Sequence, residues 1–153
     1  MRPTAIALLC LALAACGNDA PKPAKRIDTP QEAVARDGDV TMRANVIATG
    51  NLHERMAREY GIPRDGRSVL LMVSVRRGPE SSDVSLPATI TASTTNLQGQ
   101  TQPIAMREMR VGELTDYIGT AQMSPPDTLR FDLKIKREGA ATSTMAFSRD
   151  FEP

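Results

Sequence analysis

The strictest constraint on the fold of this chain is an alternation of apolar and polar side chains, clearest between Thr128 and Lys136. Every second residue there is apolar, and the residues between them are charged: Leu129, Phe131, Leu133 and Ile135 alternate with Arg130, Asp132 and Lys134. Successive side chains of a β-strand point to opposite faces of a sheet. The alternation therefore predicts a strand with one face in a core and the other in water.

Similar stretches recur along the chain, separated by turn residues. They cover 40–46, 67–77, 85–95, 102–111, 114–123 and 128–136, and a last strand places Met145, Phe147 and Phe151 on one face. In 67–77, Leu70 and Met72 lie opposite the main apolar face, which predicts a central strand covered on both sides. About seven short strands predict an all-β fold, an antiparallel Ig-like β-sandwich. It lacks the Cys…Trp…Cys signature of true immunoglobulin domains.

One short helix is predicted after the first strand. Apolar residues recur there every four positions, at Leu52, Met56 and Tyr60. Asn51 can cap the start of the helix, with Glu54 reaching back to it. Gly61 ends the helix, and Pro63 prevents its continuation.

The start of the chain predicts export and lipid attachment. Arg2 precedes an apolar run from Ala5 to Leu13, shorter than the about 20 apolar residues that span a bilayer. The run ends in Leu-Ala-Ala-Cys at 13–16, which resembles the lipobox of bacterial lipoproteins. The resemblance implies that residues 1–15 are a signal peptide and that Cys16 carries lipid. The alternative is a plain secretory signal with a coincidental cysteine.

Residues 16–38 are predicted to form a lipidated flexible tether, and 39–153 the β-sandwich domain. The tether is rich in Pro, Lys, Ala and Asp and has no periodicity. Gly17, rather than Asp, follows the lipidated cysteine, which favours the outer membrane, facing the periplasm. Cys10 is lost with the signal peptide, so neither a disulfide nor a cysteine-based metal site is expected. No cofactor is expected either.

Charge and composition argue for a globular domain without a nucleic-acid partner. Hydrophobic residues make up 41% of the 153 residues and charged residues 24%, which is typical of a folded chain. Removing residues 1–15 takes one of 19 basic residues and leaves 18 against 18 acidic ones. Balanced charge provides no electrostatic attraction for nucleic acid. Aromatic residues are only 3%, so aliphatic side chains and methionine must fill the core.

Four segments carry a family resemblance. They read TTNLQGQT at 94–101, REMRVGE at 107–113, DTLRF at 127–131 and AREYGI at 57–62. Together they resemble the proteobacterial domain-of-unknown-function family 4426, over roughly 39–151. The resemblance implies an exported single-domain β-sandwich with no assigned activity, so it supplies no catalytic residues. Its members carry an ordinary secretory signal, from which this chain departs.

Metal binding is a weak possibility on sequence grounds. His53 is the only histidine, and a lone histidine is more often a solvated surface residue than a ligand or general base. Met106, Met109 and Met123 lie in one predicted hairpin, and thioethers favour Cu(I). In an uninterrupted strand, however, Met106 and Met109 point to opposite faces. Core packing is the simpler interpretation of these methionines.

The same hairpin, around Gly112-Glu113, is crowded with charges of both signs. Arg107, Glu108, Arg110 and Glu113 are predicted to form a docking surface, with Tyr117 as an aromatic anchor; the alternative is an edge strand that charge keeps soluble. The chain has no P-loop, Gly-rich dinucleotide turn, HExxH or GxSxG motif. We therefore expect a non-enzymatic interaction module that is lipid-anchored to the envelope membrane and binds an envelope protein. The alternative is a periplasmic copper or small-ligand carrier.

Overall fold

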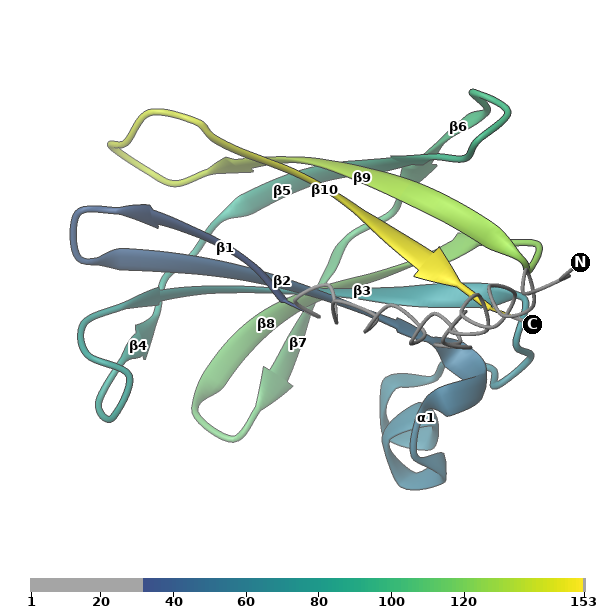
Figure 1. Ribbon diagram of the computed structural model, residues 1–153. Helices are drawn as coiled ribbons and strands as arrows, with labels where there is room; N and C mark the ends of the chain where they lie inside the picture. Colours follow the sequence, from purple (N-terminus) through teal and green to yellow (C-terminus); the bar gives the residue numbers. More distant parts are fainter. Residues whose placement is uncertain (1–31, 153) are drawn as a thin grey trace, which may run out of the picture.

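A computed structural model describes residues 32–152, and its strands form two antiparallel sheets that lie face to face (Figure 1). The six-stranded sheet runs β1 (Glu32–Asp37), β2 (Val40–Ala48), β3 (Ser68–Arg77), β8 (Leu114–Gln122) and β7 (Arg107–Val111), with β4 (Val84–Ser85) paired to β3. The four-stranded sheet runs β10 (Ser143–Phe151), β9 (Asp127–Lys136), β5 (Thr89–Thr95) and β6 (Thr101–Ile104). The predicted fold class, an all-β antiparallel sandwich, is confirmed.

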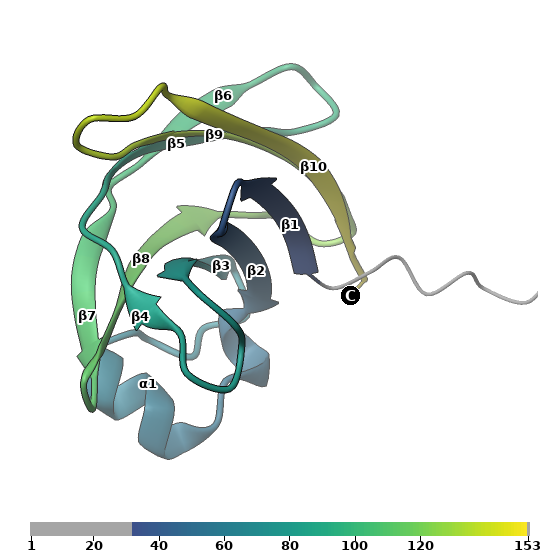
Figure 2. The same ribbon diagram turned by 90° about the vertical axis from the view of Figure 1, so that its left-hand side faces the viewer.

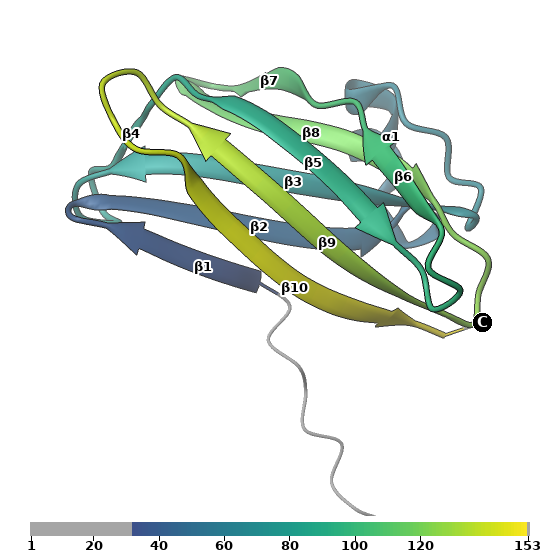
Figure 3. The same cartoon turned by 90° about the horizontal axis from the view of Figure 1, so that it is seen from above.

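The two sheets are strongly curved and twisted. Seen from one end, they arch over a common interior, with β1 beside β10 (Figure 2). Seen from above, the strands of the four-stranded sheet run obliquely across those of the other sheet (Figure 3), as the twist of packed sheets requires. No helix within residues 32–152 combines the length and the apolar character needed to cross a bilayer.

The folded domain begins earlier than the sequence predicted. Strand β1 lies inside the 16–38 range assigned to the tether, and it pairs with β2 from Glu32↔Asn45 to Asp37↔Val40. The sequence of this strand, EAVARD, gives only a weak signal for a β-strand. The two side chains that it packs against the core are the small ones of Ala33 and Ala35. Gly38-Asp39 is the two-residue loop between the paired residues Asp37 and Val40, and a glycine with positive φ (+60°) at its first position is a typical hairpin signal.

The predicted long strand 102–111 is two strands in different sheets. Strand β6 ends at Ile104 in the four-stranded sheet, and β7 begins at Arg107 in the six-stranded sheet. The chain crosses between the sheets at Ala105 and Met106, directly over Gly119 of β8. This break, with the short strands β1 and β4, raises the strand count to ten, compared with the about seven expected.

The helix prediction is right in kind and wrong at its start. Helix α1 spans Glu54–Tyr60 and follows β2, the second strand. His53, not Asn51, occupies its N-cap position, because Thr49–Asn51 forms a short 3₁₀ helix of its own, η1. Gly61 ends α1 as predicted: it has φ +65°, a left-handed conformation that favours glycine.

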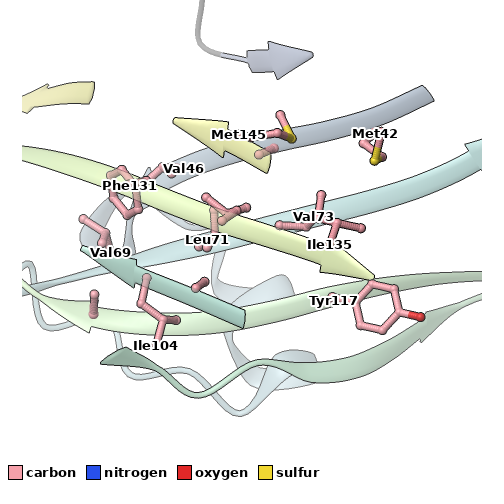
Figure 4. Packing of buried hydrophobic residues seen from close by; sticks show 14 of the residues in the cluster. Met42, Val46, Val69, Leu71, Val73, Ile104, Tyr117, Phe131, Ile135 and Met145 are labelled. Carbon is pink, nitrogen blue, oxygen red and sulfur yellow. The ribbon is translucent and has the colours of Figure 1, made fainter. Parts of the chain in front are cut away.

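The core lies between the two sheets and follows the alternation. The four predicted inward residues of β9 are at most 2% exposed. They face Val69, Leu71, Val73 and Val75 of β3, which are fully buried (Figure 4). Burying each such side chain stabilises the fold by about 1.5–3 kcal/mol relative to exposure. The aliphatic core predicted from the low aromatic content is therefore the main contact between the sheets.

A second, smaller apolar cluster lies on the outer face of the six-stranded sheet, under α1. Ala57 and Tyr60 of the helix pack with Leu70 of β3 and Ile118 of β8, all buried. Met72 and Met109 are partly buried around this cluster. The expectation that 67–77 is covered on both faces is confirmed.

Gly119 generates a stability prediction. A Cβ at this position would lie 2.8 Å from the carbonyl oxygen of Ala105 and 2.6 Å from Ile104 Cγ2. We expect Gly119→Ala to lower the free energy of unfolding by about 1–3 kcal/mol, because the crossing chain has to shift. Urea denaturation measures the loss. Gly139→Ala is the control, because it meets only an unfavourable φ of +69° with open space around it. A Gly119→Ala variant as stable as wild type would contradict the close approach at Gly119.

Candidate functional site

A polar pocket of about 450 Å³ opens at the end of the sandwich where the β5–β6 turn and the β8–β9 connection lie. This is the right-hand end in Figure 1. The lining residues come from both sheets: Thr94, Asn96, Gln98, Gln100, Thr101, Gln102, Gln122, Met123, Ser124, Pro126, Asp127 and Leu129. Two of the segments that carry the family resemblance, 94–101 and 127–131, contribute to this lining.

The β5–β6 turn is shaped by one side chain. Asn96 Oδ1 accepts hydrogen bonds from the main-chain N–H groups of Gln98 (3.1 Å) and Gln100 (2.9 Å). Asn96 Nδ2 donates to Gln100 Oε1 at 2.8 Å. Gly99 adopts φ +77°, which closes the turn. The TNLQGQ sequence thus specifies a rigid loop that forms one rim of the pocket.

The two sheets are joined beside the pocket by a single glutamine. Gln102 of β6 donates from Nε2 to the carbonyl oxygen of Gln122 at 2.9 Å, and its Oε1 accepts from the Gln122 N–H at 3.2 Å. The side-chain amide imitates a neighbouring strand and ties β6 to the end of β8. Sequence reasoning missed this role, since the chain contains several glutamines and only the tertiary structure singles one out.

The inner wall of the pocket contains an unsatisfied hydroxyl. Thr94 is 1% exposed, and its Oγ1 has no hydrogen-bond partner among the described residues. Met123 and Leu129, both buried, form the apolar part of the lining. A buried hydroxyl without a partner is unfavourable by about 1–3 kcal/mol, and Thr94 is the one residue of the lining with such a group.

The lining is made mainly of neutral hydrogen-bonding groups. Asp127 is its one charged residue, and the lining contains no histidine, cysteine, lysine, arginine or aromatic residue. Its amides and hydroxyls donate and accept hydrogen bonds at neutral charge. These residues include no histidine that could act as a base and no set of metal ligands.

The charged hairpin that the sequence selected is only partly a free surface. Arg107 donates from its guanidinium to the carbonyl oxygen of Tyr60, the last residue of α1, where a cation is favourable. Tyr117, predicted as an aromatic anchor of the docking surface, is only 4% exposed, and its hydroxyl accepts a hydrogen bond from the Ala88 N–H at 2.7 Å. That prediction was wrong because Tyr117 faces inward, while its neighbour Ile118 faces α1.

Four residues of the predicted docking surface are exposed: Arg107, Glu108, Arg110 and Glu113. In the β7–β8 ladder, Glu108 lies opposite Tyr117 and Arg110 lies opposite Thr115. Because side chains alternate along a strand, Glu108 and Arg110 point to the opposite face of β7 from Arg107. Asp116, close to this hairpin in sequence, is held by a mostly buried ion pair with Arg76 of β3. Arg76 also donates to the Thr115 carbonyl at 2.7 Å. This pair, which the sequence did not indicate, has a structural role.

The four residues of the metal hypothesis lie in three different environments. His53 is exposed at the start of α1. Met106 and Met123 pack against the core between the sheets, whereas Met109 packs against the cluster under α1. Among residues 32–152, no three His, Cys, Asp or Glu side chains are grouped to hold a metal ion. Cys16, the predicted lipidation site, lies outside the described residues.

A further polar cluster, around Asp65, is a structural element. Asp65 Oδ1 accepts hydrogen bonds from the Arg67 N–H (2.9 Å), Ser68 Oγ (2.9 Å) and Thr49 Oγ1 (3.2 Å). These bonds, led by the one from the Arg67 main chain, hold the pKa of Asp65 below its usual 3.8. The cluster organises the loop between α1 and β3, with its two hydroxyls and the Arg67 N–H all donating to the same Asp65 oxygen.

Comparison with known proteins places the chain in a structural context. The family model described as Domain of unknown function (DUF4426) matches residues 34–152. No curated protein matches. Among solved structures, a DUF4426 family protein from Pseudomonas aeruginosa is similar with a TM-score of 0.68 and 23% identity, over 80% of this chain and 96% of that chain.

Two structures of FetP from uropathogenic Escherichia coli share the fold at 12% identity. A copper-bound variant has a TM-score of 0.54 over 78% of this chain and 93% of that chain. FetP as isolated, expressed in the periplasm of Escherichia coli, has a TM-score of 0.55 over 81% of this chain and 98% of that chain. At this identity the similarity extends to the fold alone.

Asp65 predicts a specific pH dependence. Because its folded-state pKa is lowered, its carboxylate contributes stability that is fully present above pH 3.8 and is lost as the pH falls through the folded pKa. We expect Asp65→Asn to melt at a lower temperature than wild type at neutral pH, with the difference shrinking in acid. Melting curves across this range measure it. Asp83→Asn is the control, and a constant difference for Asp65→Asn would refute the linkage.

The contact between Arg107 and α1 predicts unequal effects of two neighbouring arginines. Arg107→Ala removes the hydrogen bond to the Tyr60 carbonyl, and we expect the free energy of unfolding to fall by about 1 kcal/mol. Arg110→Ala, on the exposed face, should change it by less than about 0.5 kcal/mol. Chemical denaturation of both variants compares them, and equal values would exclude a helix-docking role for Arg107.

Proposed function

The chain belongs to the family described as Domain of unknown function (DUF4426), and on that premise we propose that it is a non-catalytic binding module of the cell envelope. In this proposal Cys16 carries the lipid anchor, the domain faces the periplasm from the outer membrane, and the partner is another envelope protein. Nucleic acid is not among the proposed partners. The balanced charge of the chain supports that exclusion.

One observation carries the proposal: the pocket at the open end of the sandwich. Its volume of about 450 Å³ lies within the range of ligand sites. Its rim is held in place by Asn96, and its walls present hydrogen-bonding groups but only one ionisable residue, Asp127. A site with this composition can recognise a ligand through hydrogen bonds, with Asp127 as its one carboxylate and no histidine or cysteine beside it. The lone histidine, His53, is exposed, which also supports a non-catalytic role.

Copper binding is the second candidate, and the copper-bound FetP variant with the same fold favours considering it. The separation of Met109 from Met106 and Met123 argues against a single site made from these methionines. A Cu(I) titration against a competing chelator decides between the candidates. Stoichiometric, tight binding that is lost in Met106→Leu or Met123→Leu would replace the binding-module proposal with a carrier function.

The anchor itself is testable by fractionation. We expect Cys16→Ser to move the protein from the membrane fraction to the soluble periplasmic fraction, because two or more acyl chains are needed to hold a protein firmly at a membrane. Immunoblotting of the separated fractions measures the shift, and Cys10→Ser is the control that should stay membrane-bound. Membrane retention of Cys16→Ser would contradict lipid anchoring.

The partner is identified by crosslinking in intact cells, affinity capture and mass spectrometry. An envelope protein enriched with wild type, and lost when the pocket amides are removed in Gln98→Ala/Gln122→Ala, supports a pocket-centred binding module. Loss with Arg110→Glu instead would move the binding surface to the exposed hairpin. No protein enriched above the Cys16→Ser control would overturn the proposal of an envelope protein partner.

A further inference from the structure

We propose that the pocket binds a short, extended peptide segment of its partner, mainly through the peptide's main-chain amides. This inference rests on the proposed function and names its ligand class. It starts from the free hydrogen-bonding groups of the pocket. Within residues 32–152, no hydrogen bond engages the side-chain amides of Gln98 and Gln122, although both line the pocket. Each offers a donor and an acceptor, the pair that a peptide group presents.

The edge of β6 adds main-chain groups to this set. The Asn96 N–H donates to the Gln100 carbonyl at 3.1 Å, and hydrogen-bonded and non-hydrogen-bonded pairs alternate along an antiparallel ladder. Thr101, which pairs with Thr95, therefore directs its N–H and C=O away from β5, toward the free edge. Pro103, two residues on, has no N–H. A bound strand can thus pair with β6 only near Thr101, which limits the segment to a few residues.

The inner wall contains a buried polar atom for which a bound peptide would supply the hydrogen-bond partner. Thr94 Oγ1 is enclosed and unsatisfied, next to the apolar surface of Met123 and Leu129. A peptide carbonyl entering between the sheets can accept a hydrogen bond from this hydroxyl, while a small apolar side chain rests on the two buried residues. The unfavourable state of Thr94 in the free protein is then relieved on binding.

Other ligand classes fit the lining less well. An anion lacks a basic residue to pair with, because no lysine or arginine lines the pocket. A nucleobase or a sugar ring lacks an aromatic side chain on which to stack. Side-chain amides and a strand edge are instead the groups that recognise a peptide main chain. Because these contacts are made to main-chain groups, the site should accept a simple peptide with small side chains.

The test titrates the isotope-labelled full chain in detergent micelles and follows side-chain amide signals by NMR. The probe is penta-alanine with blocked ends, and chitopentaose is the comparison ligand. We expect penta-alanine to shift the Gln98 and Gln122 amide signals in a saturable way, and chitopentaose to leave them unchanged. Gln98→Ala/Gln122→Ala, followed through the side-chain amide signals of Asn96 and Gln102, should weaken peptide binding about tenfold or more. Thr144→Ala, on the exposed outer face of β10, is the control and should bind as wild type does.

Thr94→Val provides the second arm. It replaces the unsatisfied hydroxyl by a methyl group of similar size, so we expect a melting temperature equal to or above that of wild type together with weaker peptide binding. Weakened binding with a lower melting temperature would show only that the variant is damaged. In that case the test depends on Gln98→Ala/Gln122→Ala, because these two side chains are exposed and their removal should not damage the fold.

The outcomes separate this inference from the proposed function. Shifts caused by chitopentaose instead of the peptide would overturn the peptide inference and leave a binding module with a glycan ligand. No pocket shifts up to about 10 mM peptide, with a partner still captured in cells through the hairpin, would overturn the inference alone. No pocket shifts and no captured partner would overturn both.

Discussion

The contact between β9 and β3 across the sandwich is the interaction on which the rest of the structure depends. Aliphatic side chains from the two strands, together with the larger aromatic ring of Phe131, are almost completely buried between the sheets. With few aromatic residues available, close packing of branched and flexible side chains has to replace large rings. Phe131 stacks on Phe147 of β10 at 5.3 Å between ring centroids, which is the one stacked aromatic pair within residues 32–152.

Polar ties hold the sandwich together where this core ends. At one end, the Arg137 guanidinium, buried in the β9–β10 connection, pairs with Asp37 of β1. At the other end, the Gln102 side chain binds the main chain of Gln122. Beside this second tie the lining becomes mostly polar, with Met123 and Leu129 as its buried apolar side chains and Thr94 next to them. The candidate pocket is the direct consequence of a core that stops before its strands do.

The β5–β6 turn both carries the family resemblance and lines the candidate pocket, and its geometry explains part of this overlap. Asn96 and Gly99 are required by the geometry of the β5–β6 turn, since Asn96 satisfies two main-chain N–H groups and Gly99 supplies a positive φ. Those requirements account for Asn96 and Gly99 but not for Gln98, whose exposed side chain has no structural role. The hairpin 107–113 likewise contains one residue with a structural contact and one without. Arg107 donates a hydrogen bond to the last residue of α1, whereas the Arg110 side chain is exposed.

The sequence by itself determined the fold class, the inward faces of the strands and the end of α1 at Gly61, because these follow from local periodicity and local conformational preference. It also suggested the TNLQGQ segment, though only as a family signature. Tertiary structure alone decided the crossing of the chain between sheets at Gly119, the inward direction of Tyr117 and the division of the methionines between two clusters. Those features depend on which strand becomes the neighbour of which, over separations of up to 100 residues as between Asp37 and Arg137. Alternation fixes the face a side chain takes but not the strand it meets, so the pocket between Thr94 and Gln122 was not visible before the two sheets were assembled.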